Sequence, residues 1–215
     1  MSQVHPLGTV VDLWRYPVKS LAPEVLDIAH FDRSGVVGDR ANALFVTSSG
    51  HARMQKTYRG KENERLHTVR ESHDAVALAG ARGVAIELRT EGPYFDLDPV
   101  SIIFDTWLRD GERLVGRSLE PLRYRPNIFA RATSDFTARE NELIDRILEI
   151  GDVALRVTEP IHRCVTPSYD LETCESDPRV LEIIARERAN TMGIYAVVIR
   201  TGSVRAHDTI TFATP

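Results

Sequence analysis

The stretch GTVVDLWRYPVKSL, residues 8–21, begins the strand-rich part of the chain and ends just beyond a charged side chain. Its β-branched and aromatic residues are typical of a β-strand. Pro17 removes a backbone donor and ends regular pairing, so Lys19 leaves the strand end and could point its charge into a cleft. An exposed lysine at a strand end is the alternative interpretation.

The composition is that of a soluble globular protein. The 215 residues suit one large domain or two small ones packed together, with 42% hydrophobic and 27% charged residues. The formal net charge of -4 argues against nucleic acid as a main partner.

Cysteine content and hydropathy indicate the compartment. Cys164 and Cys174 are too few for a disulfide framework, and we expect both to be reduced. No run approaches the roughly 18 apolar residues that span a bilayer. The first 20 residues lack the basic start and apolar core of a signal peptide. We therefore expect a cytoplasmic protein with no membrane association.

Short strands with few helices are expected along the chain. Strands are predicted at residues 24–32 and 41–50, and a hairpin from DAVALAG (74–80) and GVAIELRT (83–90). The polar, basic residues 55–70 are interpreted as a mobile loop that leads into a short strand.

Helices are expected in the second half. One is predicted over residues 98–111, with Asp98 as its cap and Gly111 just past its end, and another over residues 176–190. Residues 141–157 could begin helical and finish as strands, and residues 193–212 are predicted to form two closing strands.

These patterns favour a mainly β (α+β) fold, a β-barrel or strand-dominated arrangement with a few short helices, over alternating βαβ units. The turn-rich residues 90–99 mark the best boundary, which gives predicted domains at residues 1–95 and 96–215. The motifs GxGxxG, HExxH and CxxC and the P-loop are all missing.

Two polar motifs could bind an anion. In GVVGDR, residues 35–40, the glycines permit a tight turn whose amides can face an anion, although Asp39 and Arg40 could instead form a surface salt bridge. In RYRPNI, residues 123–128, the proline is expected to restrict Arg125 to extended geometry, and Asn127 offers a donor and an acceptor. Arginine suits bidentate phosphate contacts, and a polar strand start is the alternative interpretation of this motif.

A third motif, EPIHRCVTPSYD, residues 159–170, places Cys164 beside Arg163 and His162. Positive charge favours a thiolate, which could ligate a soft metal or act as a nucleophile. A plain buried cysteine is the alternative. His162 is interpreted as a structural histidine or as one that supports a ligand, rather than as a metal ligand, and Cys174 as a loop residue.

Taken in order, these motifs resemble the MOSC family, named for the C-terminal domain of molybdenum cofactor sulfurases. The pair LWRYPVKSL and GVVGDR is similar to the N-terminal β-barrel region of that family, with its pattern YPIKS followed by GLxxDR. YRPNI, EIGD, PIHRCVTPSYD and GIYAVVIRTGSVRAHDTI resemble the MOSC domain itself. The resemblance covers nearly the whole chain.

The resemblance implies a barrel that binds the molybdenum cofactor (molybdopterin), with Cys164 as the metal ligand. In relatives of the mitochondrial amidoxime-reducing component, such a cysteine serves an oxidoreductase that reduces small N-hydroxylated substrates with electrons from a separate redox protein. The cofactor-binding residues that the resemblance implies are Lys19, Asp39, Arg40, Arg125, Asn127, Arg163, Thr166 and Asp170. Thr166 and Asp170 would orient the loop that carries Cys164, called the cysteine loop below.

The chain also departs from the family pattern. Ile161 stands where many relatives have a second cysteine, and His207 replaces a glycine near the end. Two alternatives to the oxidoreductase therefore stay open at this point. One is a non-enzymatic module that carries cofactor or sulfur on Cys164, and the other is an enzyme with Cys164 as nucleophile.

Overall fold

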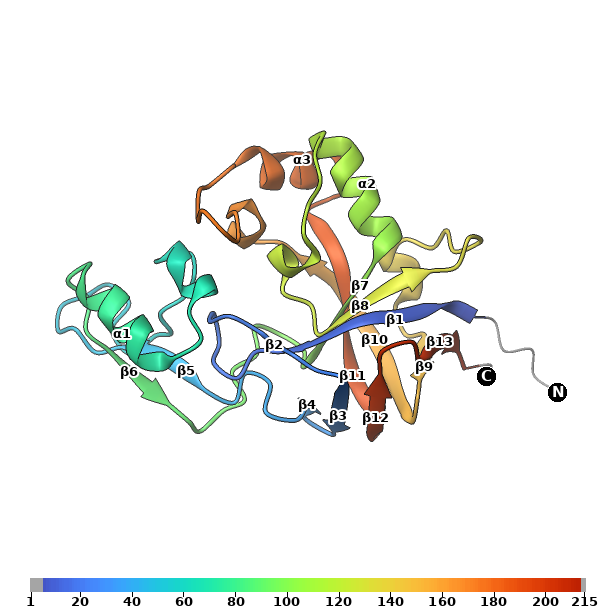
Figure 1. The fold of residues 1–215 in the computed structure, drawn as a ribbon, viewed down its shortest axis with the longest axis horizontal. Helices are drawn as coiled ribbons and strands as arrows, with labels where there is room; N and C mark the ends of the chain where they lie inside the picture. Colours follow the sequence, from blue (N-terminus) through green and yellow to red (C-terminus); the bar gives the residue numbers. More distant parts are fainter. Residues whose placement is uncertain (1–5, 214–215) are drawn as a thin grey trace.

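The computed structural model describes residues 6–213, in which seven strands close into a barrel (Figure 1). The barrel strands are β1 (Pro6–Arg15), β7 (Val100–Phe104), β8 (Ile128–Ala132), β9 (Ile147–Ile150), β10 (Val153–His162), β11 (Thr191–Arg200) and β13 (Thr209–Phe212). They are hydrogen-bonded in the order β13, β9, β10, β11, β7, β8, β1, and β1 pairs again with β13. The mainly β barrel expected from the sequence is confirmed.

Strand β1 closes the barrel because it pairs on both edges, with β13 along its first half and with β8 along most of its length. The register shifts between Val10 and Asp12, and this irregularity bends the strand. All neighbouring strands of the barrel are antiparallel except β7 and β8, which are parallel.

One hydrophobic cluster fills the barrel and continues under its helices. Val10, Ile102 and Ile194 are fully buried, as expected for the inward positions of strands. Phe104 stacks on Phe136 with ring centroids 4.5 Å apart. Each large apolar side chain buried in this way contributes about 1.5–3 kcal/mol relative to its exposed state.

Three short strands flank the barrel. The strands are β2 (Glu24–Val25), β3 (Ile28–Asp32) and β4 (Gly35–Val36). Strand β2 extends the edge of β1, whereas β3 and β4 form a small sheet with β12 (Gly202–Arg205). The prediction of two closing strands over residues 193–212 is therefore wrong. The segment forms three strands, because it turns at Asp208, whose carboxylate accepts the Arg205 amide at 2.7 Å.

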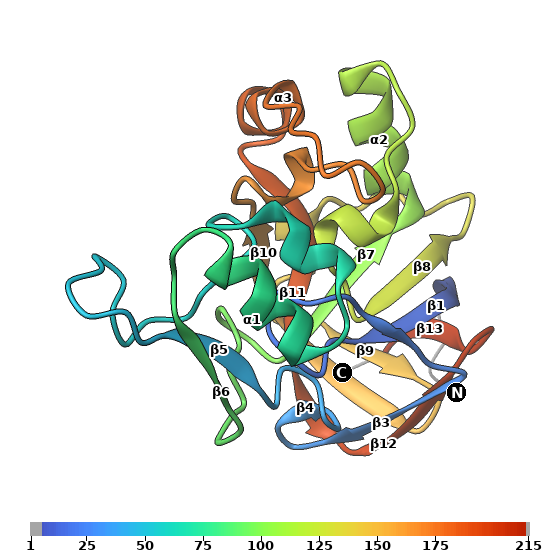
Figure 2. The same ribbon diagram turned by 60° about the vertical axis from the view of Figure 1, so that its left-hand side comes forward.

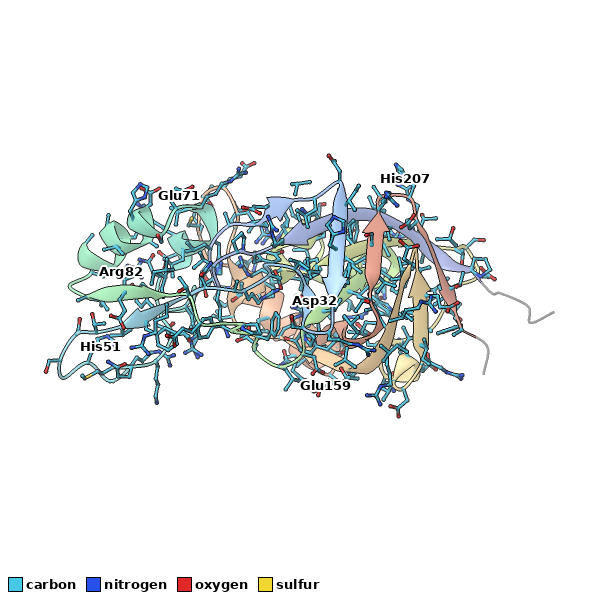
Figure 3. The ribbon with its side chains drawn as sticks, turned by 90° about the horizontal axis from the view of Figure 1, so that it is seen from below. Asp32, His51, Glu71, Arg82, Glu159 and His207 are labelled. Carbon is cyan, nitrogen blue, oxygen red and sulfur yellow. The ribbon has the colours of Figure 1, made fainter. Side chains whose placement is uncertain are left out.

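A side lobe, residues 43–89, lies to one side of the barrel (Figures 1 and 2). Its elements are β5 (Ala43–Val46), the 3-10 helix η1 (Glu64–Thr68), α1 (Ser72–Gly80) and β6 (Ile86–Arg89). They pack on a second hydrophobic cluster that includes Leu44, Leu66 and Ile86. Figure 3 shows this lobe, with His51, Glu71 and Arg82, extending away from the part that carries Asp32, Glu159 and His207.

Two predictions for the side lobe are wrong. Residues 74–80 do not form a hairpin strand but lie in α1, and β6 pairs with β5 instead. Ala75 and Ala79, four positions apart, share one buried helix face, and alanine favours helix wherever packing permits it. Residues 55–70 contain the helix η1 rather than leading into a strand, because Leu66 is fully buried in the second cluster.

Two α-helices cover the barrel, α2 (Asp105–Val115) and α3 (Arg179–Glu187). The prediction for residues 176–190 is confirmed by α3, whereas the helix predicted from Asp98 to Gly111 is right only for its second half, which lies in α2. Its first part is strand β7, whose five residues are all buried. A parallel strand covered on both faces reads as a continuous apolar run, which the sequence alone does not distinguish from a buried helix. Helix α2 ends at Gly116, where φ is +81°.

Three further 3-10 helices are η2 (Pro121–Tyr124), η3 (Glu140–Leu143) and η4 (Thr166–Ser168). The ambiguous residues 141–157 contain the end of η3, then β9 and the start of β10. Among residues 6–213, no helix has the length and apolar character needed to cross a membrane.

Gly193, in strand β11, has no room for a side chain, and we predict that Gly193→Ala destabilises the protein. The backbone has φ +87°, and an added Cβ would lie 2.7 Å from the Ile102 carbonyl oxygen. We expect a loss of about 3 kcal/mol in unfolding free energy, measured by urea denaturation. Gly116→Ala is the control. Its φ is also positive but its Cβ would meet nothing within 4 Å, so only about 1 kcal/mol should be lost. Equal losses in the two variants would contradict the prediction.

Candidate functional site

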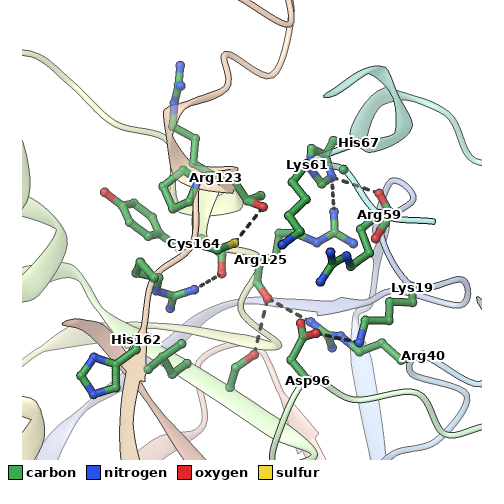
Figure 4. Close-up of a pocket in the computed structure, with 18 of the residues that line it drawn as sticks. Lys19, Arg40, Arg59, Lys61, His67, Asp96, Arg123, Arg125, His162 and Cys164 are labelled. Carbon is green, nitrogen blue, oxygen red and sulfur yellow. Dashed lines mark hydrogen bonds and ion pairs between the residues drawn. The ribbon is translucent and has the colours of Figure 1, made fainter. Parts of the chain in front are cut away.

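A pocket of about 260 Å³ lies where the barrel end, the turn after β1 and the side lobe meet (Figure 4). It brings together segments that are far apart in the sequence. Its lining includes Lys19, Ser20, Arg40, Arg59, Gly60, Lys61, His67, Asp96, Arg123, Tyr124, Arg125, Ile161, Arg163, Cys164 and Thr166. Six of the predicted site residues are therefore in one pocket: Lys19, Arg40, Arg125, Arg163, Cys164 and Thr166.

Cys164 stands just beyond the end of β10, with an exposed side chain and a free thiol. The only hydrogen-bond partner of its sulfur in residues 6–213 is the Thr166 hydroxyl, 3.2 Å away. Ile161, which takes the place of a second cysteine, is buried and lines the same wall. His162 is exposed and points away from the sulfur (Figure 4). The thiol is thus accessible from the pocket and has no histidine base beside it.

Arg163 ties the cysteine loop to the barrel. Its guanidinium donates to the carbonyl of Tyr124 at 2.8 Å and to the carbonyl of Met192, also at 2.8 Å through Nε. The group also lies over the Tyr124 ring, 5.3 Å from its centroid. Burial lowers the pKa of Arg163 from its usual value. Because its donors are used on two carbonyls, the side chain fixes the start of the loop that presents Cys164.

Arg125 adopts the left-handed conformation, with φ +52° and ψ +49°, so the prediction of extended geometry before Pro126 is wrong. Its backbone caps η2, and its guanidinium donates to the Leu21 carbonyl at 2.7 Å. The guanidinium lies 4.2 Å from the centroid of the Tyr16 ring. These contacts outweigh the cost of an unfavourable backbone angle. Burial lowers the pKa of Arg125 to about 10, and no carboxylate in residues 6–213 pairs with it.

The Arg40 guanidinium also lies over the Tyr16 ring, 4.7 Å from its centroid. It pairs with Asp39, whose side chain is completely buried, so the alternative of a surface salt bridge is wrong. Asp39 also accepts the Tyr16 amide at 2.7 Å. Burial disfavours the charged guanidinium, but the adjacent Asp39 carboxylate outweighs that cost and raises the pKa of Arg40. Asp39 therefore lies behind the pocket and holds Arg40.

Lys19 points into the pocket, as the sequence suggested, with its side chain only 12% exposed. Its ammonium group pairs with Asp96 at 2.6 Å and donates to the Phe95 carbonyl at 3.3 Å. Desolvation opposes ionisation of Asp96, but the charges of Lys19, Arg40 and Arg125 outweigh it and lower the pKa of this carboxyl.

The remaining predicted residues, Asn127 and Asp170, lie outside the pocket lining. Asn127 is buried in the barrel wall, where it accepts from the Ser101 amide at 3.1 Å and donates to the Trp14 carbonyl at 3.2 Å. Asp170 accepts the amides of Glu172 and Thr173 at 3.0 Å, and Arg123 at 2.6 Å. These amides and the arginine lower the pKa of Asp170 to about 2.

The sequence-based interpretation missed the wall that the side lobe provides. Arg59, Lys61 and His67 all come from residues 55–70, which were interpreted as a mobile loop. The basic composition of that segment was the only signal. Its position against the cysteine loop depends on the packing of η1, which no local pattern reveals.

His67 is the buried joint between the side lobe and the barrel. Its ring Nδ1 donates to the Ser20 carbonyl at 3.0 Å, and its Nε2 is buried without a partner in residues 6–213. Burial lowers the pKa of His67 to about 3, and the charge of Arg125 acts in the same direction. The ring is therefore neutral at physiological pH.

Comparison with known proteins places this chain in a family. The MOSC domain model matches residues 95–211, and the MOSC N-terminal beta barrel domain model matches residues 7–92. The chain belongs to the MOSC family. No curated protein sequence matches it significantly.

One solved structure supports the fold. This MOSC protein is similar to the YUAD protein from Bacillus subtilis, with 15% identity, a TM-score of 0.59, and coverage of 99% of this chain and 100% of that one. A second similar structure is YiiM from Escherichia coli, with 9% identity, a TM-score of 0.47, and coverage of 100% of this chain and 71% of that one. At 15% identity, the similarity to the YUAD protein supports the fold alone. We draw no conclusion from the similarity to YiiM.

We predict that His67 makes the stability of the MOSC protein depend on pH. The unfolded chain has a histidine pKa near 6.5, whereas the folded one has a pKa of about 3, so the unfolded state alone takes up a proton between these values. Stability from this residue is complete above pH 6.5 and falls as the pH decreases. Between pH 7 and pH 5 we expect a loss of roughly 2 kcal/mol in unfolding free energy by urea denaturation.

The variant His67→Gln removes this titration while it keeps a side-chain donor. Because all other groups titrate in both proteins, the difference between the two pH profiles isolates His67. Parallel profiles from pH 7 to pH 5 would show that His67 is not the source.

Proposed function

We propose that this MOSC protein binds the molybdenum cofactor through Cys164 and reduces small N-hydroxylated or related substrates. A separate redox protein would supply the electrons. The observation that carries the proposal is an accessible thiol at the edge of a strongly cationic pocket. Among the described residues the lining holds seven lysine and arginine side chains, Lys19, Arg40, Arg59, Lys61, Arg123, Arg125 and Arg163, and one carboxylate, Asp96.

The donor set fits the proposed cofactor. A thiolate is a suitable ligand for molybdenum, and the pterin carries a phosphate and a dithiolene, both anionic. Arg125 has no carboxylate partner in residues 6–213. Lys19 pairs with the exposed carboxylate of Asp96, so positive charge remains available in the pocket. Without an anion, the positively charged side chains of the pocket would repel one another, and a bound phosphate would relieve that repulsion.

Individual residues would then take distinct tasks. Cys164 would ligate the metal, and Thr166 would hold the thiolate with a hydrogen bond from its hydroxyl. Lys19, Arg40 and Arg125 would bind the phosphate, with Asp39 and Tyr16 keeping the two guanidiniums in place. Arg163 would fix the cysteine loop through its bonds to the carbonyls of Tyr124 and Met192.

When bound, the cofactor supplies a two-electron centre that removes the oxygen of an N–OH group. The overall change is R–NHOH plus two electrons and two protons to R–NH₂ and water. The exposed position of Cys164 keeps the reacting end of the pocket open to a small substrate. The same exposure would let a donor protein approach the centre closely enough for electron transfer.

We predict that Cys164→Ser loses most of its molybdenum, whereas Cys174→Ser keeps it. Cys174 is the matched control because it is also a free thiol, but it lies in the loop after η4 and does not line the pocket. A hydroxyl is a much poorer ligand for this metal than a thiolate. Both proteins would be produced in a cofactor-competent host, and molybdenum and pterin per chain would be measured.

We expect at least a tenfold lower molybdenum content in Cys164→Ser, with the loss of reduction of an aromatic amidoxime by a chemical reductant. A folded wild-type protein without molybdenum or pterin would refute the proposal. Cofactor at full content in the wild type without turnover of any N-hydroxylated compound would support a carrier instead.

A further inference from the structure

Lys61 is a cation of the pocket that no carboxylate of residues 6–213 neutralises. Its side chain is exposed and points toward the middle of the pocket, on the side lobe and across from Cys164 (Figure 4). It has no hydrogen-bond or ion-pair partner within residues 6–213. By contrast, Lys19 pairs with Asp96 and Arg40 with Asp39.

The neighbouring Arg59 is only partly neutralised. Its guanidinium pairs with Glu62 at 2.8 Å, but the same carboxylate is also shared with Arg53 at 3.2 Å. Desolvation opposes the ionisation of Glu62, and the two arginines outweigh it and lower its pKa. One negative charge thus serves two positive ones, so the segment keeps net positive charge next to Lys61.

The segment that carries these two cations is held rigidly. The amides of Glu62 and Asn63 both donate to the Arg59 carbonyl, which closes a tight turn. Gly60 packs against the His67 ring so closely that an added Cβ would lie 2.0 Å from Nε2. His67 in turn is bonded to the Ser20 carbonyl, which belongs to the barrel side. The backbone at Arg59 and Lys61 is therefore anchored beside the pocket.

The cations of the pocket fall into two groups by their position. Lys19, Arg40 and Arg125 lie together around Tyr16 and the turn after β1, and the proposed function assigns them the cofactor phosphate. Arg59 and Lys61 come from the side lobe and face the open part of the pocket (Figure 4). A molecule that reacts beside Cys164 would have this second group within reach.

We propose that Arg59 and Lys61 form an anion site that binds a carboxylate or phosphate group of the substrate. The preferred substrates are then N-hydroxylated compounds that also carry such a group, which deepens the proposed function and rests on it. Lys61 supplies the unpaired charge, and Arg59 adds hydrogen-bond donors from the same turn. The site selects among substrates without taking part in the reduction.

The test compares two substrates in four proteins. The substrates are a neutral aromatic amidoxime and the same compound with a carboxylate on the ring. The proteins are the wild type, Lys61→Ala, Lys61→Arg and Lys56→Ala, all produced with cofactor. Lys56 is the matched control, an exposed lysine of the same lobe that does not line the pocket.

We expect Lys61→Ala to raise the KM for the carboxylate compound about tenfold relative to that for the neutral one, which corresponds to about 1.4 kcal/mol. Lys61→Arg should restore most of this preference, and Lys56→Ala should leave the ratio at the wild-type value. An unchanged ratio in Lys61→Ala would overturn the inference. So would a loss of molybdenum and pterin from Lys61→Ala, because Lys61 would then serve the cofactor.

A binding measurement separates this inference from the proposed function. Benzoate is titrated into the wild type and Lys61→Ala by calorimetry, which needs no turnover. If neither substrate is reduced but benzoate binds the wild type at least tenfold more tightly, the reduction proposal fails and the anion site stands. Equal benzoate affinities in the two proteins would refute the anion site, whatever the activity.

Discussion

The ring of Tyr16 is the contact on which the pocket depends. It is fully buried, and two guanidiniums lie over it, Arg40 at 4.7 Å and Arg125 at 4.2 Å from its centroid. Two like charges so close together would repel each other in a site of low dielectric. The π-electrons of the ring and the Asp39 carboxylate offset that repulsion, so the protein can keep both cations beside one pocket. Burial raises the pKa of Tyr16 to about 12, so its hydroxyl stays protonated and donates to the Pro126 carbonyl at 3.1 Å.

The barrel explains why these residues meet. Strands β1 and β8 are neighbours, and Asn127 joins them to β7 through its bonds to Trp14 and Ser101. Strands β10 and β11 bring Arg163 against the same end of the barrel, where it reaches Tyr124. The turn after β1, η2 and the cysteine loop are therefore fixed by one closed sheet. The side lobe then packs on the remaining side through His67 and adds a wall of its own.

Some of the fold could be predicted from local pattern, and the errors have identifiable causes. The strand character of residues 8–15 and the helix at 179–187 were found because their periodicity is clear. Strand β7 was misassigned since all five of its residues are buried, which removes the alternation that marks a strand. The α1 helix was missed because its short apolar run suits either element, and only its packing on Leu66 and Ile86 decides between them.

For the site, the sequence by itself determined the family and marked candidate residues. The motif order placed the chain among MOSC proteins, and the residue types marked Cys164 and a set of basic side chains. Only the tertiary structure decided which of them share a pocket, because their segments are joined by non-local strand pairing. It placed Asp39 and Asn127 behind the wall, gave Arg125 a left-handed backbone, and brought Lys61 opposite Cys164. Contacts between residues a hundred positions apart do not affect local periodicity, so they could not be predicted from patterns of neighbouring residues.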